Sequence, residues 1–168
     1  AHDFPFFCVS IALEVDNDLK LGVIYDPNRD ELFTAEDGKG AKLNGKPIYV
    51  SVPSVLRQSL LATGFAYNVQ EGETLNNLVH FCNFIKTARA VRRPGSAAID
   101  LAWVACGRID GFWELFLKPW DMAAGVIIVR EAHGLVTSFD GSPFDLYGNE
   151  ILASNGKIHA EMVDVLMK

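Results

Sequence analysis

The stretch LKPWDMAAGVIIVREAHG, Leu117 to Gly134, decides how the second half of this chain folds. Its apolar run predicts a helix over 121–133 that ends at a Gly. Asp121 stands at the start of that helix, and no other carboxylate follows until Glu131. The structural interpretation is an N-cap, because Asp accepts hydrogen bonds from free backbone N–H groups. The functional interpretation is a ligand for a divalent metal ion, beside a helix end that favours phosphate.

The residues around this helix alternate between strand and helix patterns. Residues 1–58 are typical of an antiparallel meander, with a turn at Asp26-Pro27-Asn28 and a hairpin at Asn44-Gly45. After residue 58, strands are expected at 59–65, 89–93, 109–117, 135–140 and 150–155, and helices at 73–88, 94–108 and 157–168. Helices interleaved with strands predict a layered α/β fold, with helices covering a sheet. We find no second domain boundary, so residues 1–168 are interpreted as one region.

Composition and charge exclude several classes of function. The 168 residues are 49% hydrophobic and 21% charged, which predicts a compact soluble domain. The net charge of −6 provides no electrostatic footprint for nucleic acid or an anionic membrane. The longest apolar runs are far shorter than a membrane span, and the N-terminus has no signal-peptide pattern. The chain also contains no GxxxxGK[ST], GxGxxG or GxSxG motif.

The cysteines and histidines do not form a metal-binding pattern. Cys8, Cys82 and Cys106 are odd in number and lie far apart in apolar contexts, so we expect buried, reduced thiols of a cytoplasmic protein. The four histidines show neither HxxxH nor HExxH spacing. His133, just before a Gly, is interpreted as a residue at a helix C-terminus.

Glu114 is the second candidate functional residue. In DGFWELFL, strand alternation places Glu114 on one face with Phe112 and Phe116, and Trp113 and Leu115 on the other. A strand that is apolar on both faces is expected to be buried, where a carboxylate is costly unless it is paired or part of a site. The residues alone leave open whether Glu114 belongs to a site or reaches solvent or one of Arg92, Arg93 and Arg108.

The third feature is the turn RRPGSAA, which precedes a helix rich in small residues. Ser96 is a natural N-cap, and Gly95 allows the backbone to approach a ligand. Free N–H groups at such a helix start can bind hydroxyls or phosphate oxygens. The structural alternative is a tight turn between strand and helix. Arg92 and Arg93 are interpreted as solvated strand residues.

These three features together resemble one family. The segment GSAAIDLAWVACGRIDGFWELFLKPWDMAAGVIIVREAHG resembles the C-terminal signature of the inositol monophosphatase family, whose pattern runs PWDxAAG before an apolar helix and a Gly. FPFFCVSIAL, GVIYDPNRDELFTAEDGKGAKLNGKPI and RRPGSAAIDLAW resemble the same family in the same order. The resemblance covers nearly the whole chain and implies the later part of that fold, with mixed sheets covered by helices.

The resemblance assigns roles by position. Asp121 matches an Asp that binds a catalytic Mg²⁺ and touches substrate. Glu114 matches a Glu that hydrogen-bonds sugar or inositol hydroxyls. Gly95, Ser96 and Ala97 match a stretch at the helix start that contacts substrate. The family likeness also implies a homodimer.

The chain departs from the family pattern in its metal-binding motifs. Members carry a DPxDGT motif and an earlier Glu, which supply most of the metal ligands, and neither is present here. Mg²⁺ takes six oxygen ligands in near-octahedral geometry. Asp121 alone cannot organise such ions, so this chain is expected to be the later part of a Mg²⁺-dependent phosphatase and to be inactive by itself.

The resemblance implies a small phosphate ester as the substrate, and the net charge of −6 argues against nucleic acid or a membrane as partner. The main expectation is hydrolysis of myo-inositol 1-phosphate to inositol and phosphate. Within the same chemistry, the alternatives are fructose 1,6-bisphosphate, histidinol phosphate and a 3′-phosphonucleotide. A noncatalytic interaction domain that lost its first metal half is the alternative from a different class. An in-frame DPxDGT upstream would favour the enzyme, and a start codon just before Ala1 would favour the interaction domain.

Overall fold

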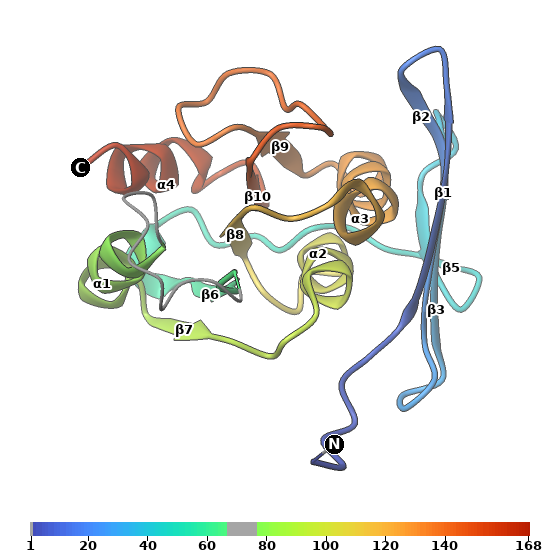
Figure 1. Cartoon of the computed structure of the whole chain (residues 1–168), viewed down its shortest axis with the longest axis horizontal. Coiled ribbons are helices and arrows are strands. Elements are labelled where there is room, and N and C mark those ends of the chain that lie inside the picture. The colour runs from blue at the N-terminus through green and yellow to red at the C-terminus, as the bar shows by residue number, and fades with distance from the viewer. Residues whose placement is uncertain (1, 67–76) are drawn as a thin grey trace.

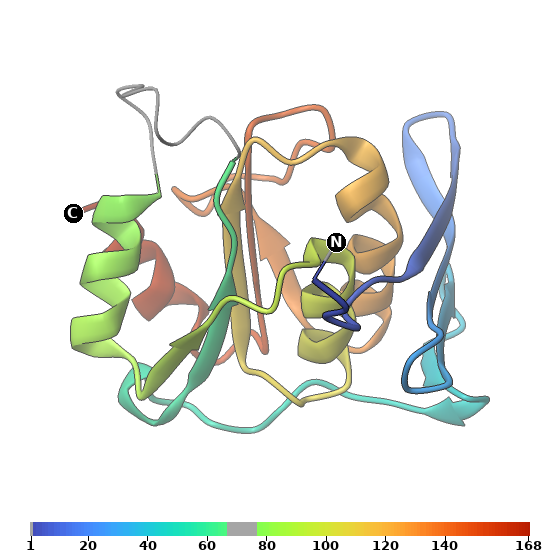
Figure 2. The same cartoon turned by 60° about the horizontal axis from the view of Figure 1, so that its bottom comes forward.

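The computed structural model describes residues 2–66 and 77–168. They form four layers that alternate between sheet and helix. The first sheet, seen edge-on at the right of Figure 1, is followed by helices α2 (Ala97–Ala105) and α3 (Pro119–Glu131), then by the second sheet, and finally by helices α1 (Leu78–Thr87) and α4 (His159–Leu166). Figure 2 shows the same order from another direction. The predicted layered α/β fold is thus confirmed.

The first sheet is antiparallel and contains only sequential neighbours. Its order is β1-β2-β3-β4-β5, with the strands at Val9–Val15, Asp18–Asp26, Glu31–Glu36, Ala41–Leu43 and Lys46–Pro47. The hairpin turn expected at Asn44-Gly45 connects β4 and β5. Both of its residues have a positive φ, 48° for Asn44 and 78° for Gly45. The carboxylate of Asp26 accepts hydrogen bonds from the backbone of Asn28 and the side chain of Arg29. Local turn chemistry therefore produces this meander.

The second sheet is mixed, as the family resemblance implied. Its order is β7-β6-β8-β10-β9, with the strands at Ala90–Arg92, Leu60–Thr63, Gly111–Leu115, Glu150–Ser154 and Leu135–Thr137. β6 is parallel to β7 and β8, whereas β10 is antiparallel to β8 and β9. A short 3₁₀ turn, Leu56–Gln58, precedes β6. β8 lies in the middle of the sheet, and all five of its residues are buried.

The two faces of β8 belong to different cores. Phe112 packs with α2 and α3 in the layer between the two sheets, and Trp113 and Leu115 pack with α1 and α4 on the opposite face. This alternation agrees with the strand pattern read from the sequence. It places the side chain of Glu114 on the same face as Phe112, toward α2 and α3.

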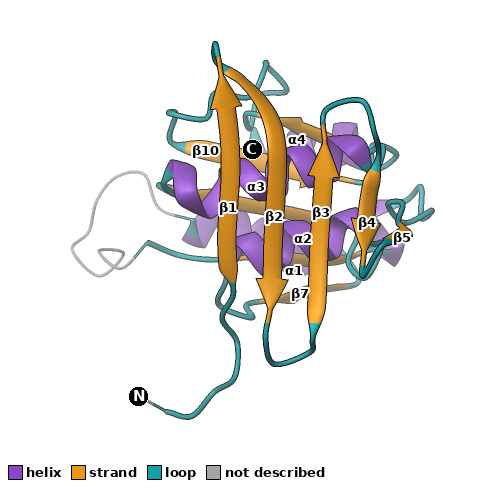
Figure 3. Cartoon of the chain, turned by 90° about the vertical axis from the view of Figure 1, so that its right-hand side faces the viewer, coloured by secondary structure: helices purple, strands orange, loops and turns teal. Residues whose placement is uncertain are grey.

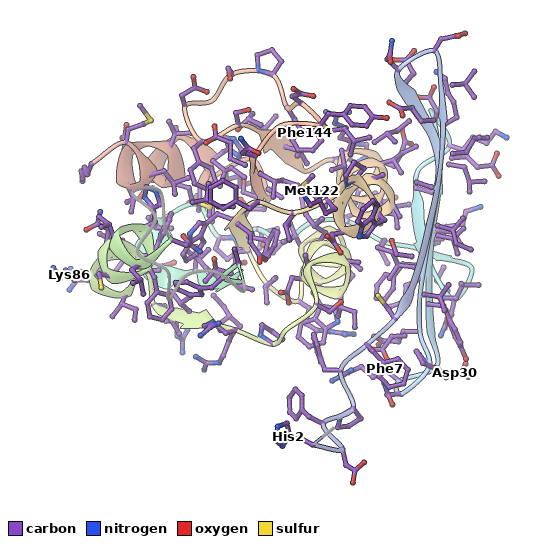
Figure 4. The ribbon with its side chains drawn as sticks, in the orientation of Figure 1. His2, Phe7, Asp30, Lys86, Met122 and Phe144 are labelled. Carbon is purple, nitrogen blue, oxygen red and sulfur yellow. The ribbon has the colours of Figure 1, made fainter. Side chains whose placement is uncertain are left out.

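Close packing of α3 depends on glycine. A Cβ at Gly125 would lie 2.5 Å from Cβ of Leu101 on α2, and a Cβ at Gly22 of β2 would lie 2.5 Å from Cγ2 of Ile127. The small residues after Asp121 therefore allow the approach of a neighbouring helix and sheet. Met122, the residue after Asp121, is buried in the same interior and is labelled in Figure 4.

The outer face of the first sheet exposes apolar side chains. Figure 3 views this face directly, and no layer of the described chain stands in front of it. Alternate residues of β1, namely Val9, Ile11, Leu13 and Val15, are 44–57% exposed. Opposite Ile11 and Leu13, β2 contributes Val23 and Leu21, which are only partly buried. A row of β-branched and leucine side chains on one sheet face is unusual for a solvent-facing surface.

Several local expectations differ from the structure. Helix α1 begins at Leu78 rather than at residue 73, and residues 73–76 lie outside the described part of the chain. Cys82 was expected to be buried but is exposed, because α1 turns Phe84 toward the core and leaves Cys82 on its solvent side. Cys8 and Cys106 are only half-buried, and all three thiols are free. Among the described residues, no helix is long and apolar enough to cross a membrane.

His159 at the start of α4 is a buried core histidine. Its Nε2 lies 2.8 Å from Oγ1 of Thr137, and its Nδ1 lies 2.8 Å from Oγ of Ser154. Burial lowers the pKa of His159 from 6.5 to about 4. Both ring nitrogens thus have hydroxyl partners, and the neutral imidazole is the form that the fold stabilises.

This burial predicts a loss of stability in acid. As pH falls from 6.5 toward 4, the unfolded chain binds a proton at His159 that the folded chain does not, so the free energy of unfolding falls by up to about 1.4 kcal/mol per pH unit. Urea unfolding across this range, compared between the wild type and His159→Gln, measures the contribution. The variant is expected to show the shallower pH dependence, and identical slopes would contradict the prediction.

Candidate functional site

The three features singled out in the sequence meet in one pocket of about 650 Å³. The pocket lies where the segment leading into β1, the end of β6, the turn before α2, β8 and the start of α3 come together. Phe7, labelled in Figure 4, lines it from the N-terminal segment. Asp121, Glu114 and the residues Gly95, Ser96 and Ala97 all contribute to its wall. Residues separated by more than 100 positions in the sequence are therefore adjacent here.

Asp121 is half-buried at the third position of α3 rather than at its N-cap. The N-cap is Lys118, and its backbone N–H donates a hydrogen bond of 3.0 Å to Oδ2 of Asp121. The sequence interpretation of Asp121 as the cap is wrong by three residues, because Pro119 begins the helix earlier and needs no N–H partner there. The carboxylate still stabilises the helix start, and it lines the pocket.

Glu114 reaches the pocket from the middle of the second sheet. Its side chain is only 8% exposed, and its carboxylate lies against Gly64, where a Cβ would collide with it. Burial raises the pKa of Glu114 to about 7; the charge of Asp121 adds to this rise and Arg93 opposes it. Arg108, one of the partners considered from the sequence, instead pairs with Glu31 at 2.7 Å. Glu114 is therefore a buried carboxyl that faces a cavity rather than solvent.

The turn before α2 forms another part of the pocket wall. Gly95 has a φ of 109°, a value that favours glycine, and Ser96 is the N-cap of α2, accepting a hydrogen bond of 3.4 Å from the N–H of Ile99. The hydroxyl of Ser96 also lies 3.6 Å from Sγ of Cys8. The helix therefore starts at Ala97, at the edge of the pocket, as the sequence predicted.

The structure adds pocket residues that the sequence interpretation did not single out. Arg93 is exposed and lines the pocket, with its guanidinium 4.3 Å from the ring centroid of Phe65. Thr63 and Gly64 follow at the end of β6. Asp100, on the first turns of α2, is 1% exposed. A single acid in the small-residue run SAAIDLA was a readable signal for Asp100, but its contact with the pocket depends on the packing of α2.

The carboxylates present do not by themselves form a metal site. No cluster of three or more His, Cys, Asp or Glu side chains suited to a metal ion occurs in residues 2–66 and 77–168. Asp121 offers hard carboxylate oxygen, the donor type that Mg²⁺ prefers, but only as one ligand. Chemically, the pocket presents hydrogen-bonding groups for hydroxyls, one guanidinium, and two helix starts that favour an anion.

The fold is that of a layered α/β protein, and its pocket is lined by both charged and apolar side chains. Comparison with known proteins narrows this class. The model of the inositol monophosphatase family matches residues 1–166. An inositol-1-monophosphatase from Synechocystis sp. is 53% identical over 99% of this chain and 58% of its own length. A Nus factor SuhB from Escherichia coli is 42% identical over 95% of this chain and 59% of its own.

A solved structure from the same family has the same fold as this chain. The inositol monophosphatase from Anabaena (Nostoc) sp. superimposes with a TM-score of 0.96 at 50% identity, covering 99% of this chain and 66% of that one. The chain belongs to the inositol monophosphatase family, a family of phosphatases that are generally metal-dependent. It spans about three fifths of the length of the curated relatives it matches.

Proposed function

We propose that the complete protein hydrolyses a phosphate monoester, myo-inositol 1-phosphate, to inositol and phosphate with Mg²⁺. The observation that carries the proposal is that Asp121, Glu114 and the 95–97 turn line one pocket although they come from three separate elements. Membership of a phosphatase family and 53% identity to a protein named inositol-1-monophosphatase support it.

Different pocket residues would bind different parts of this substrate. Asp121 would hold Mg²⁺ through its half-buried carboxylate while the start of α3 favours the nearby phosphate. When bound, such ions neutralise phosphate charge and lower the pKa of a coordinated water. Glu114 would accept hydrogen bonds from ring hydroxyls, and its position deep in the second sheet fixes its orientation. The 95–97 turn would orient the ring through backbone N–H groups and the Ser96 hydroxyl.

We propose further that this chain is the later part of the enzyme and is inactive alone. Three observations support this. The curated relatives are longer, and the described residues contain no group of three metal-ligating side chains. The outer face of the first sheet also exposes Val9, Ile11 and Leu13, which a further layer of chain would bury. A segment upstream of Ala1 that covers this face and brings carboxylates to Asp121 would account for all three.

Phosphate release from myo-inositol 1-phosphate tests the proposal directly. The 168-residue chain is compared with a chain extended upstream, each with and without Mg²⁺. Only the extended chain with Mg²⁺ is expected to release phosphate. Equal activity in the short chain would show that its own residues complete the site, and no activity in either would favour the noncatalytic interaction domain. Fructose 1,6-bisphosphate and histidinol phosphate, tested alongside, separate the related substrates.

Two further properties are proposed. The three free cysteines support a cytoplasmic location, and family likeness supports a homodimer. Sedimentation velocity of the extended chain measures the second, and a monomer at micromolar concentration would rule out the stable homodimer.

A further inference from the structure

Asp100 is a buried acid that nothing in the fold requires. It sits at the fourth position of α2, where its backbone N–H donates to the carbonyl of Ser96 at 2.9 Å, as any residue there would. Its side chain is 1% exposed and lines the pocket. The surrounding residues of α2 are apolar and buried, including Ile99 and Leu101. An apolar side chain would therefore serve packing at this position better than a carboxyl does.

One oxygen of the Asp100 carboxyl also lacks a hydrogen-bond partner. Its Oδ1 is buried without a hydrogen bond to any residue in the described part of the chain. Two other buried acids do have partners: Asp26 accepts a hydrogen bond from Arg29, and Asp110 accepts from Ser51 and from the N–H of Leu60. An unpartnered buried polar oxygen costs about 1–3 kcal/mol. Asp100 is thus maintained at a cost to stability, which is typical of residues kept for a site.

The neighbourhood of Asp100 favours its neutral form. Burial raises the pKa of Asp100 to about 8, with the carboxylate of Glu114 adding to the effect. A neutral carboxyl offers one O–H donor and one carbonyl acceptor, whereas ionised Glu114 can only accept. A hydroxyl both donates and accepts, so the two side chains together match adjacent hydroxyls of a polyol.

We propose that Asp100 is a specificity-determining residue of this pocket, whose side chain hydrogen-bonds a ring hydroxyl of a polyhydroxylated phosphate ester. This inference rests on the proposed function and deepens it. Glu114 approaches the ligand from β8 and Asp100 from α2, so that the hydroxyl-bearing part of the substrate is held from two layers of the fold. The phosphate is left to the start of α3.

The test measures substrate preference in the full-length gene product. Two substrates are used: myo-inositol 1-phosphate, which carries ring hydroxyls, and p-nitrophenyl phosphate, which carries none. The ratio compared is kcat/KM for myo-inositol 1-phosphate divided by kcat/KM for p-nitrophenyl phosphate. Asp100→Ala is expected to lower this ratio about tenfold or more, because only the inositol substrate loses a hydrogen bond in a dry site. Asp100→Asn keeps a donor and an acceptor, and is expected to keep the ratio within about threefold of the wild type.

Thermal unfolding without ligand supplies a second readout. Asp100→Ala is expected to raise Tm by several degrees, because it removes a costly buried polar group, whereas Asp100→Asn keeps such a group and is expected to leave Tm nearly unchanged. Asp110→Asn is the matched control: it removes a buried but bonded carboxylate outside the pocket, and is expected to lower Tm without changing the ratio.

The outcomes separate this inference from the proposed function. If Asp100→Ala lowers kcat/KM equally for both substrates, or for neither, the assignment of Asp100 is overturned while the phosphatase proposal stands. If both Asp100 variants lower Tm and Asn fails to rescue the ratio, Asp100 is a structural residue and the assignment is overturned as well. If the wild type hydrolyses neither substrate, the proposed function fails and this inference fails with it.

Discussion

Asp121→Asn in the complete protein is expected to lower kcat/KM for myo-inositol 1-phosphate by about a thousandfold. The substitution keeps the shape of the side chain and its acceptor for the N–H of Lys118, so α3 should still begin at Pro119. It removes the negative charge with which Asp121 is proposed to hold a divalent cation. Steady-state kinetics over a range of Mg²⁺ concentrations measure the effect, and circular dichroism checks that the variant is folded.

Glu114→Gln is the matched control for this prediction. It removes a carboxylate from the same pocket at a residue assigned to hydroxyl binding rather than to metal. We expect a smaller loss of activity and an altered preference among phosphate esters, with little change in the Mg²⁺ dependence. Equal losses in the two variants, or a shift in Mg²⁺ dependence only for Glu114→Gln, would refute this division of roles.

Gly125→Ala is expected to destabilise the fold by about 3 kcal/mol, although in an ordinary helix the same change stabilises by up to about 1 kcal/mol. The reason for the reversed sign is that the new Cβ would lie 2.5 Å from Cβ of Leu101. Because both atoms are close to their backbones, α2 and α3 would have to move apart. Urea denaturation of the 168-residue chain gives the change in the free energy of unfolding.

A double-mutant cycle with Leu101→Ala isolates the contact. Leu101→Ala alone leaves a cavity and is expected to destabilise. In the Gly125→Ala background it relieves part of the overlap. The double variant should therefore lose less unfolding free energy than the sum of the losses in the two single variants. Strict additivity would show that the two helices do not meet through these residues.

Elements with a strong local signal could be predicted well from the sequence. The hairpin at Asn44-Gly45 and the N-cap at Ser96 depend on neighbours in the chain, and the structure has both. The alternation in β8 was equally readable, because successive side chains of a strand point to opposite faces. The face that carries Glu114 was therefore predictable, although what that face meets was not.

Features that depend on packing between elements could not be predicted. Cys82 lies in an apolar context, yet it is exposed because α1 covers its sheet through Phe84. The assignment of Asp121 as a cap was wrong for a local reason instead, because Pro119 begins α3 and leaves Asp121 at the third position. Arg93 is exposed, as interpreted from the sequence, but no local pattern indicated that it would also line the pocket beside Phe65.

The layered order of strands and helices, the resemblance to one family and the three candidate features of the site could all be read from the sequence. These follow from local periodicity, turn chemistry and motif spacing, all of which act over a few residues. Long-range packing, by contrast, brings Asp121, Glu114, the 95–97 turn and Asp100 into one pocket. That arrangement depends on the close approach of α2 and α3 at Gly125 and on the burial of β8 between two helical layers. Burial in turn shifts the pKa values of Asp100 and Glu114, because desolvation is a property of the packed fold and not of any short segment.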